Sequence, residues 1–374
     1  MLLSTYEVTE PVAELFQFHR GQDVFFMLML VAFLMLFIRR YEWGVALATM
    51  LSFVVAWPLY LLISNTVLGI DINIESVILA VFCAITLVIA IGVFLGQIST
   101  IHYITAAVLF VPAYMFNEWF IFSFLDGVLD AGGSILVHMF AAYWGWGVIL
   151  GLRNRKINDE PMKTSVHSVS FVWLASMLLL VLWPSFVTAL LPPEEVLPAM
   201  FTCYMALVAS ALSTYLLSYI LKKEIDPLVY TYAMLAGGVA IGATVNLVGP
   251  LTGWIIGFIA GLVSTWCFYY LHDWLNKTTG VLDTMGVHNL HGVPGIVGAV
   301  AAMVVAGAPL AQLWAILGTL VIGIVTGGIT GLILKIFKEP KQLLDDSEAF
   351  DMTEARTPDS PLIHGEQHGG TAPA

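Results

Sequence analysis

The sequence predicts an all-α, polytopic membrane protein that crosses the bilayer eleven times. Of its 374 residues, 59% are hydrophobic and only 11% are charged, and the mean hydropathy is +0.90. A soluble domain has roughly 25% charged residues. Here the charges lie in short clusters between apolar runs of about 20 residues, the length that crosses a ~30 Å hydrocarbon core as a helix. The predicted spans are 23–38, 44–64, 75–96, 101–124, 131–151, 166–190, 196–220, 228–248, 251–271, 286–306 and 312–336.

The positions of the basic residues orient the chain. Thirteen of the fourteen Lys and Arg residues lie on one side of the predicted spans, and only Arg20 lies on the other. Cytoplasmic loops are enriched in Lys and Arg, so we expect the N-terminus outside and the C-terminus in the cytoplasm. Residues 1–22 would then form an outer segment and 23–338 the membrane domain. Residues 339–374 hold eight acids against two bases and are expected to be a disordered cytoplasmic tail.

The composition excludes several kinds of site. Cys83, Cys203 and Cys267 all lie in predicted spans, so we interpret them as small buried side chains, neither a disulfide framework nor metal ligands. Much of the net charge of −12 belongs to the acidic tail. The chain shows no surface for nucleic acid, and it predicts no cofactor.

Two of the predicted spans begin with the same polar pattern. Span five opens with "DAGGSILVH", Asp130 to His138, and span ten opens with "DTMGVHNLH", Asp283 to His291. Each pattern has a carboxylate at its start and a histidine eight residues later, yet the two spans are predicted to start on opposite sides. Inverted repeats of this kind place a transport site near the midplane, at the repeat interface. The predicted units are repeat one (23–151), repeat two (166–306) and a final helix (312–336).

The two histidines are expected to lie close together. Eight helical residues rise about 12 Å, so in a ~30 Å core His138 and His291 reach depths that differ by only about 6 Å. Two buried histidines at matched depth favour a function over simple packing. Asp130 and Asp283 are predicted to be structural, because a carboxylate at a helix start can accept the free N–H groups. A zinc site would need three or four ligands, and His288 is only a weak third candidate.

A buried histidine pair has a definite chemistry. Neutral imidazole offers one donor and one acceptor nitrogen, while burial and mutual repulsion disfavour the charged form. Desolvating an ion costs on the order of 20 kcal/mol in the idealised limit, and a neutral solute escapes most of that cost. The residues by themselves therefore predict a narrow pore for a small polar molecule, and they do not identify that molecule.

From about residue 20 to residue 335, the sequence resembles the Rh (Rhesus) glycoprotein branch of the ammonium transporter superfamily. The resemblance rests on "GQDVFFMLMLVAFLMLFIRRY", "DAGGSILVHMFAAYWG", "LWPSF" and "DTMGVHNLHGVPGIVGA". It implies an inverted-repeat fold of eleven or twelve spans and a homotrimer with a pore through each protomer. It also implies conduction of ammonia or ammonium, with methylamine and carbon dioxide as further substrates, rather than an enzymatic activity.

The resemblance also assigns residues, beginning with the two histidines as the paired pore histidines of the family. Phe82 and Phe186 match its outer phenylalanine gate, and the directions of spans three and six put both rings on the outer side of His138. Glu118, in "FNEWF", resembles the acid that lines the outer vestibule. An extra residue between Glu118 and Asp130 weakens that last match.

Two absences refine the assignment, and two alternatives stay open. The aromatic-and-hydroxyl cation site of the bacterial ammonium transporter branch cannot be placed in this sequence, which favours the Rh branch. The external loops lack an N-x-[ST] sequon, which favours a prokaryotic plasma (inner) membrane. Carbon dioxide would suit the same pore. A membrane ammonium sensor is the other alternative, although the tail of about 36 residues has no recognisable signalling domain. The sequence does not indicate which cytoplasmic protein would regulate the channel.

Overall fold

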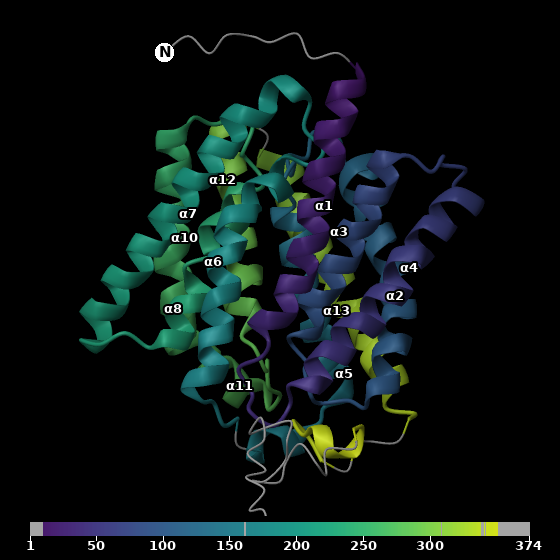
Figure 1. Cartoon of the computed structure of the whole chain (residues 1–374), viewed down its shortest axis with the longest axis vertical. Coiled ribbons are helices and arrows are strands. Elements are labelled where there is room, and N and C mark those ends of the chain that lie inside the picture. Colours follow the sequence, from purple (N-terminus) through teal and green to yellow (C-terminus); the bar gives the residue numbers. More distant parts are fainter. Residues whose placement is uncertain (1–9, 161, 308, 338–339, 341, 351–374) are drawn as a thin grey trace, which may run out of the picture.

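A computed structural model describes residues 10–160, 162–307, 309–337, 340 and 342–350. This described part is helical, without strands, and its long helices stand side by side as a bundle (Figure 1). Nine helices within it are long and apolar enough to cross a membrane. The first seven of the helices are α1 (Glu10–Leu34), α2 (Trp43–Thr66), α3 (Ile74–Ile91), α4 (Thr100–Trp119), α5 (Phe140–Leu152), α6 (Val166–Thr188) and α7 (Pro193–Lys222).

The second repeat contains shorter pieces. Its remaining helices are α8 (Pro227–Ala233), α9 (Ala236–Ile241), α10 (Pro250–Trp266), α11 (His272–Thr279) and α12 (Val293–Ala306), followed by the final helix α13 (Pro309–Leu334). π-helical turns extend four of the spans, namely η1 (Phe120–Phe124), η2 (Ser134–Met139), η4 (Cys267–Leu271) and η5 (His288–Gly292). The 3-10 turns η3 (Arg155–Asp159) and η6 (Asp346–Glu348) lie outside the spans. Together with α1 and the interrupted α8–α9, the nine membrane-crossing helices occupy the eleven predicted span positions.

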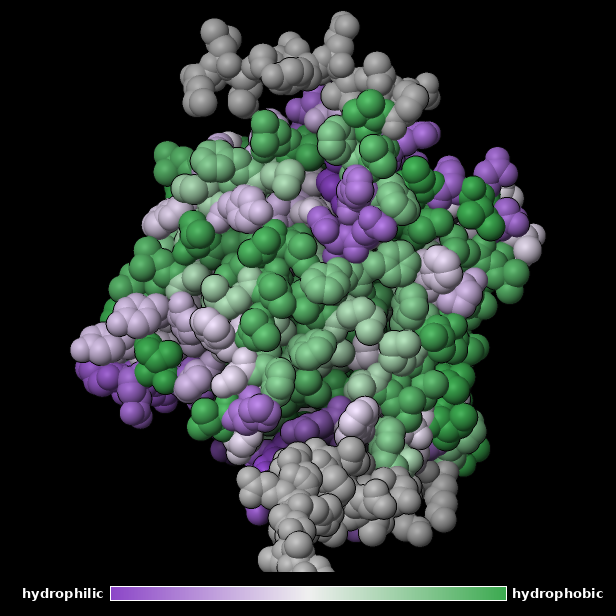
Figure 2. Space-filling view, in the orientation of Figure 1, coloured by the Kyte–Doolittle hydropathy of each residue, from purple (hydrophilic) through white to green (hydrophobic). Residues whose placement is uncertain are grey.

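The bundle has polar ends and an apolar middle. Figure 2 shows a broad band of hydrophobic residues between hydrophilic residues at either end. α1 begins at one end of the bundle, and the segment 342–350 lies at the other (Figure 1). The protein is therefore a multi-pass membrane protein whose described C-terminal segment lies opposite the start of α1.

The final helix packs closely against the span that carries His138. α13 runs along α5, as α10 runs along α7 in the second repeat. A Cβ atom on Gly327 of α13 would lie 2.0 Å from the carbonyl oxygen of Trp144 on α5, so no larger residue fits there. Small residues at such contacts let two membrane helices approach closely.

Two of the predicted spans end five or more residues earlier than the sequence predicts. Span three, predicted over 75–96, is helical only to Ile91, and span eight, predicted over 228–248, is helical only to Ile241. Beyond Ile91, the carbonyls of Gly92 and Val93 accept hydrogen bonds from the backbone N–H groups of Met285 and Thr284 (3.2 and 2.9 Å). Both donors lie at the start of the span that carries His291.

The second early end mirrors the first. Beyond Ile241, the carbonyl of Gly242 accepts a hydrogen bond from the backbone N–H of Gly132 (2.8 Å). The hydroxyl of Ser134 donates to the carbonyl of Val239 (2.7 Å) and accepts from the N–H of Ala243 (2.8 Å). Buried backbone groups need partners, and here the start of the other repeat's histidine-bearing span supplies them. In each repeat, the backbone at the early helix end thus binds the start of the other repeat's histidine span.

The expectation of a disordered tail over 339–374 is corrected for residues 342–350. Residues 351–374 lie outside the described part. The carboxylate of Asp346 accepts hydrogen bonds from three consecutive backbone N–H groups at the start of α2, those of Glu42, Trp43 and Gly44 (2.9, 2.9 and 2.7 Å). No side chain of its own caps α2, so the tail provides the acceptor that the first turn lacks.

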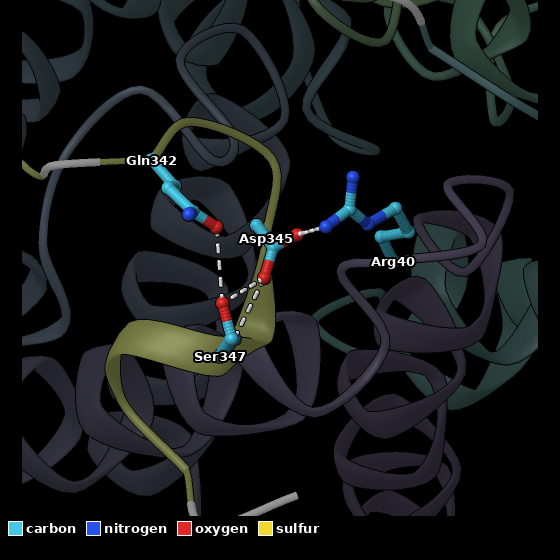
Figure 3. Close-up of polar contacts among 4 residues, drawn as sticks. All are labelled: Arg40, Gln342, Asp345 and Ser347. Carbon is cyan, nitrogen blue, oxygen red and sulfur yellow. Dashed lines mark hydrogen bonds and ion pairs between the residues drawn. The ribbon is translucent and has the colours of Figure 1, made fainter. Parts of the chain in front are cut away.

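A second acid, Asp345, also holds the segment 342–350 against the helices. Asp345 forms an ion pair with Arg40 and accepts hydrogen bonds from the backbone and side chain of Ser347 (Figure 3). Leu344 is buried, and its N–H donates to the carbonyl of Gly96 (3.0 Å) in the loop between α3 and α4. Two of the eight acids that predicted a solvated tail, Asp345 and Asp346, therefore serve as an ion-pair partner and a helix cap.

Replacing Asp346 with alanine is expected to release the start of α2. Losing the charged cap of three N–H groups costs about 2 kcal/mol. Hydrogen exchange measured on peptides covering residues 39–47 should therefore become faster by more than tenfold. Asp71→Ala, at an exposed acid in another loop, is the matched control. Unchanged exchange in Asp346→Ala would contradict the cap.

Candidate functional site

His138 and His291 contact each other inside the bundle, as their matched depths predict. Their Nδ1 atoms lie 3.1 Å apart, their ring centroids are 5.1 Å apart, and both residues are buried. A hydrogen bond between two Nδ1 atoms needs one donor and one acceptor, so the neutral pair consists of two opposite tautomers. One Nε2 atom then carries a hydrogen and the other a lone pair. The pair can therefore offer a donor and an acceptor to a small solute.

The two predicted acids hold the starts of the histidine spans in the same way. The buried carboxylate of Asp130 accepts hydrogen bonds from the backbone N–H groups of Ile135 (3.0 Å) and Leu136 (2.8 Å). The buried carboxylate of Asp283 accepts hydrogen bonds from the backbone N–H groups of three consecutive residues, Gly286, Val287 and His288 (2.9, 3.0 and 3.0 Å). These groups have no helical partner, and leaving them unpaired inside a membrane costs several kcal/mol each.

A glycine completes each helix start. Gly133 and Gly286 each stand three residues after the acid and have a φ of +75°, in the left-handed region. This turn brings the following N–H groups back to the carboxylate. The π-helical turns η2 and η5 come next, and they carry the histidines. The sequence reasoning used the acids and the histidines but missed these glycines, although "DAGG" and "DTMG" place them at equivalent positions.

Gly133→Ala is expected to destabilise the protein more than the backbone strain alone would. The left-handed conformation costs a residue with a Cβ atom about 1–2 kcal/mol. The added Cβ would also lie 2.7 Å from a methyl group of Val137. Gly69 provides the control, since it has a φ of +69° and its Cβ would meet nothing within 4 Å. A thermal melt should place Gly133→Ala below Gly69→Ala, and equal melting temperatures would refute the clash.

The predicted phenylalanine pair adjoins the histidines. The ring centroids of Phe82 and Phe186 are 4.8 Å apart, and that of Phe186 lies 5.7 Å from that of His138. A cavity of about 20 Å³ lies between Phe186 and the histidine pair. A cavity of that size holds about one small molecule. Apart from those three residues its walls are apolar or aromatic: Met27, Val31, Leu34, Ile85, Ile89, Leu179, Trp183 and Leu235.

Sequence reasoning missed one residue that lines this cavity, Trp183, and one that binds the segment next to Phe186, Asp23. Trp183 stacks on His138, with ring centroids 5.6 Å apart and planes 25° apart. Asp23 of α1 accepts a hydrogen bond from the hydroxyl of Ser185 (2.6 Å), which directly precedes Phe186. Trp183 lies in "LWPSF" and Asp23 in "GQDVFFMLMLVAFLMLFIRRY", but nothing in a single sequence indicates that α1 and α6 pack together.

Glu118 and His288 take part in other interactions. The carboxylate of Glu118 accepts a hydrogen bond from the hydroxyl of Tyr60 on α2 (2.8 Å). The Nδ1 atom of His288 lies 3.4 Å from the side-chain oxygen of Asn289, whose amide nitrogen lies 3.1 Å from the Nδ1 atom of His272. His288 therefore belongs to a separate polar chain that leads to α11.

Comparisons with known proteins agree with this arrangement. Residues 21–354 match the model of the Ammonium Transporter Family. The chain is 34% identical over 299 residues to Ammonium transporter Rh type C of Bos taurus, a match covering 76% of this chain and 64% of that protein. It is 32% identical over 360 residues to Ammonium transporter Rh type B of Sus scrofa, covering 86% and 78%. It is also similar to the solved structure of Rh50 of Nitrosomonas europaea, with a TM-score of 0.88 and 35% identity over 91% of this chain and 93% of that one.

Proposed function

This chain belongs to the Ammonium Transporter Family, and from that membership we propose that it is an Rh-type channel conducting neutral ammonia. The observation that carries the proposal is the contact between His138 and His291, 3.1 Å between Nδ1 atoms, beside a small apolar cavity. Such a site offers hydrogen bonds to a neutral molecule. It cannot replace the hydration shell of an ion, which makes the charged form costly to admit.

The order of events follows from the surroundings of the cavity. Ammonium reaches an acidic outer mouth, with Glu118 as one acid and Asp23, beside Ser185 and Phe186, as another. It leaves its proton there, because the apolar walls beyond favour the neutral form. Ammonia then passes Phe82 and Phe186, exchanges hydrogen bonds along the histidine pair, and regains a proton on the far side. Phe82 and Phe186 act as the outer gate, which opens when their contacting rings move apart.

The proposal includes an assembly and a location. The protein would form a homotrimer with one pore in each protomer, as its resemblance to the Rh branch implies. It would lie in a prokaryotic plasma membrane with its N-terminus outside and residues 339–374 in the cytoplasm. The one-sided basic residues support that orientation, and the lack of an N-x-[ST] sequon in the predicted external loops supports that source. Methylamine, a small amine that also has a neutral form, is a further proposed substrate.

Proteoliposomes test the permeant directly. An ammonium gradient is applied, and internal pH and charge movement are recorded on the same preparation. We expect internal alkalinisation faster than in empty liposomes, without any protein-dependent current. A current would mean that charge crosses, which would contradict passage of neutral ammonia. Alkalinisation no faster than in empty liposomes would contradict ammonia conduction, and a carbon dioxide gradient on the same vesicles would then test the other solute.

A further inference from the structure

A cleft opens at the surface of the bundle, and none of the residues that line it lines the cavity at the histidine pair. The cleft has a volume of about 960 Å³ and opens between the first turns of α6 and the turn that joins α7 to α8. Its polar part includes Ser165, Ser170, Lys222 and Glu224, and its apolar part includes Val166 and Trp173. Figure 2 shows hydrophilic residues gathered at this lower-left end of α7, next to the apolar band. The cleft therefore lies where a lipid headgroup meets its chains.

The charged side chains that line the cleft are one base, Lys222, and two acids, Glu224 and Asp226. The Lys222 ammonium lies over the rings of Tyr269 and Tyr270, 5.1 and 5.4 Å from their centroids. These cation–π contacts hold the charge at the cleft wall. Glu224 lines the same cleft, and within the described part of the chain neither residue forms an ion pair. Asp226 also lines the cleft, and one oxygen of its carboxylate accepts hydrogen bonds from the N–H groups of Leu228 and Val229 at the start of α8.

The apolar part of the cleft continues along an exposed face of α6. Val166, Trp173, Met177 and Val181 recur at helical spacing and are exposed, Val166 by 88% and Trp173 by 49%. Trp and Tyr rings are enriched at the level of lipid headgroups. A ligand that fits both parts has two opposite charges at one end and a long apolar chain at the other.

We propose that this cleft binds a zwitterionic phospholipid with a primary-amine headgroup, such as phosphatidylethanolamine. The phosphate would pair with Lys222 and the headgroup ammonium with Glu224, while an acyl chain follows α6 past Trp173. A free phosphate would pair with Lys222 but would place no positive group beside Glu224. A purely anionic lipid would place its negative headgroup beside the negative carboxylate of Glu224, which repels it. The proposal is independent of the permeant of the pore.

Native mass spectrometry of the full-length protein, purified in detergent and stripped of lipid, tests the site. Phosphatidylethanolamine, phosphatidylcholine and phosphatidylglycerol are titrated with identical acyl chains, together with chain-free glycerophosphoethanolamine. We expect one saturable phosphatidylethanolamine per protomer, bound at least fivefold more tightly than either other lipid. Lys222→Gln should weaken that binding about tenfold, and Glu224→Gln should remove the preference over phosphatidylglycerol. Lys223→Gln is the matched control, because Lys223 does not line the cleft but contacts the ring of Tyr219 (5.9 Å).

A second measurement locates the bound chain. Phosphatidylethanolamine with brominated acyl chains should quench tryptophan fluorescence, and Trp173→Phe should remove part of that quenching. Equal effects of Lys222→Gln and Lys223→Gln, equal binding of the three lipids, or unchanged quenching in Trp173→Phe would each overturn the proposal. Binding of glycerophosphoethanolamine as tight as that of the lipid would also overturn it, because the chain would then contribute nothing. Crosslinking of a second protomer across the cleft would also overturn the proposal, because the cleft would then be covered by protein instead of lipid.

Discussion

Asp130→Ala is expected to abolish the accumulation of folded protein. The substitution leaves the backbone N–H groups of Ile135 and Leu136 without the carboxylate that now accepts them at 3.0 and 2.8 Å. Hydrogen bonds to a charged group contribute about 1.5–3 kcal/mol each, so the loss is about 3–6 kcal/mol. A protein's whole stability is typically about 5–15 kcal/mol. Size-exclusion chromatography of detergent extracts measures the folded yield.

The isosteric variant sharpens this test. Asp130→Asn keeps one side-chain oxygen as an acceptor, so its folded yield and melting temperature should fall between those of wild type and alanine. Asp283→Ala is expected to behave like Asp130→Ala, since Asp283 accepts from three N–H groups (2.9–3.0 Å). If Asp130→Ala folds with a wild-type melting temperature, the carboxylate is not needed to hold the span. It would then have to act in the pore instead.

His138→Ala and His291→Ala are expected to lower ammonia flux by about tenfold each. Either change removes one ring of the hydrogen-bonded pair and one polar site from an otherwise apolar path. Losing one hydrogen bond to the desolvated solute costs about 1.4 kcal/mol, and that is tenfold in rate. Stopped-flow alkalinisation of proteoliposomes measures the flux.

The control for the histidines is another histidine. His167 is exposed at the start of α6, where its ring contacts that of Phe171, and it does not line the cavity at the histidine pair, so His167→Ala should conduct like wild type. Chemical crosslinking verifies assembly for every variant. If both pore variants assemble correctly and still conduct at the wild-type rate, the assignment of the pore to the histidine pair is wrong.

The candidate site shows where prediction from sequence works. The repeated spacing from Asp130 to His138 and from Asp283 to His291 was enough to expect that the two rings meet, because helix rise and bilayer thickness are both known. Phe82 and Phe186 came from the family resemblance, and their contact depends on α3 and α6 packing around α1. Trp183 and Asp23 were missed for the same reason. A hydrophobic span predicts a crossing, but it does not say which helix faces which.

The sequence by itself determined the membrane class, the eleven crossing positions and the two-fold repeat of acid and histidine. These features follow from hydrophobic length and helical rise, which are local properties of the chain. Only the tertiary structure decided that spans three and eight end at Ile91 and Ile241, and that Asp346 caps α2 from 302 to 304 residues away. In each case a buried or terminal backbone group takes its partner from a distant segment, and no local pattern records that pairing.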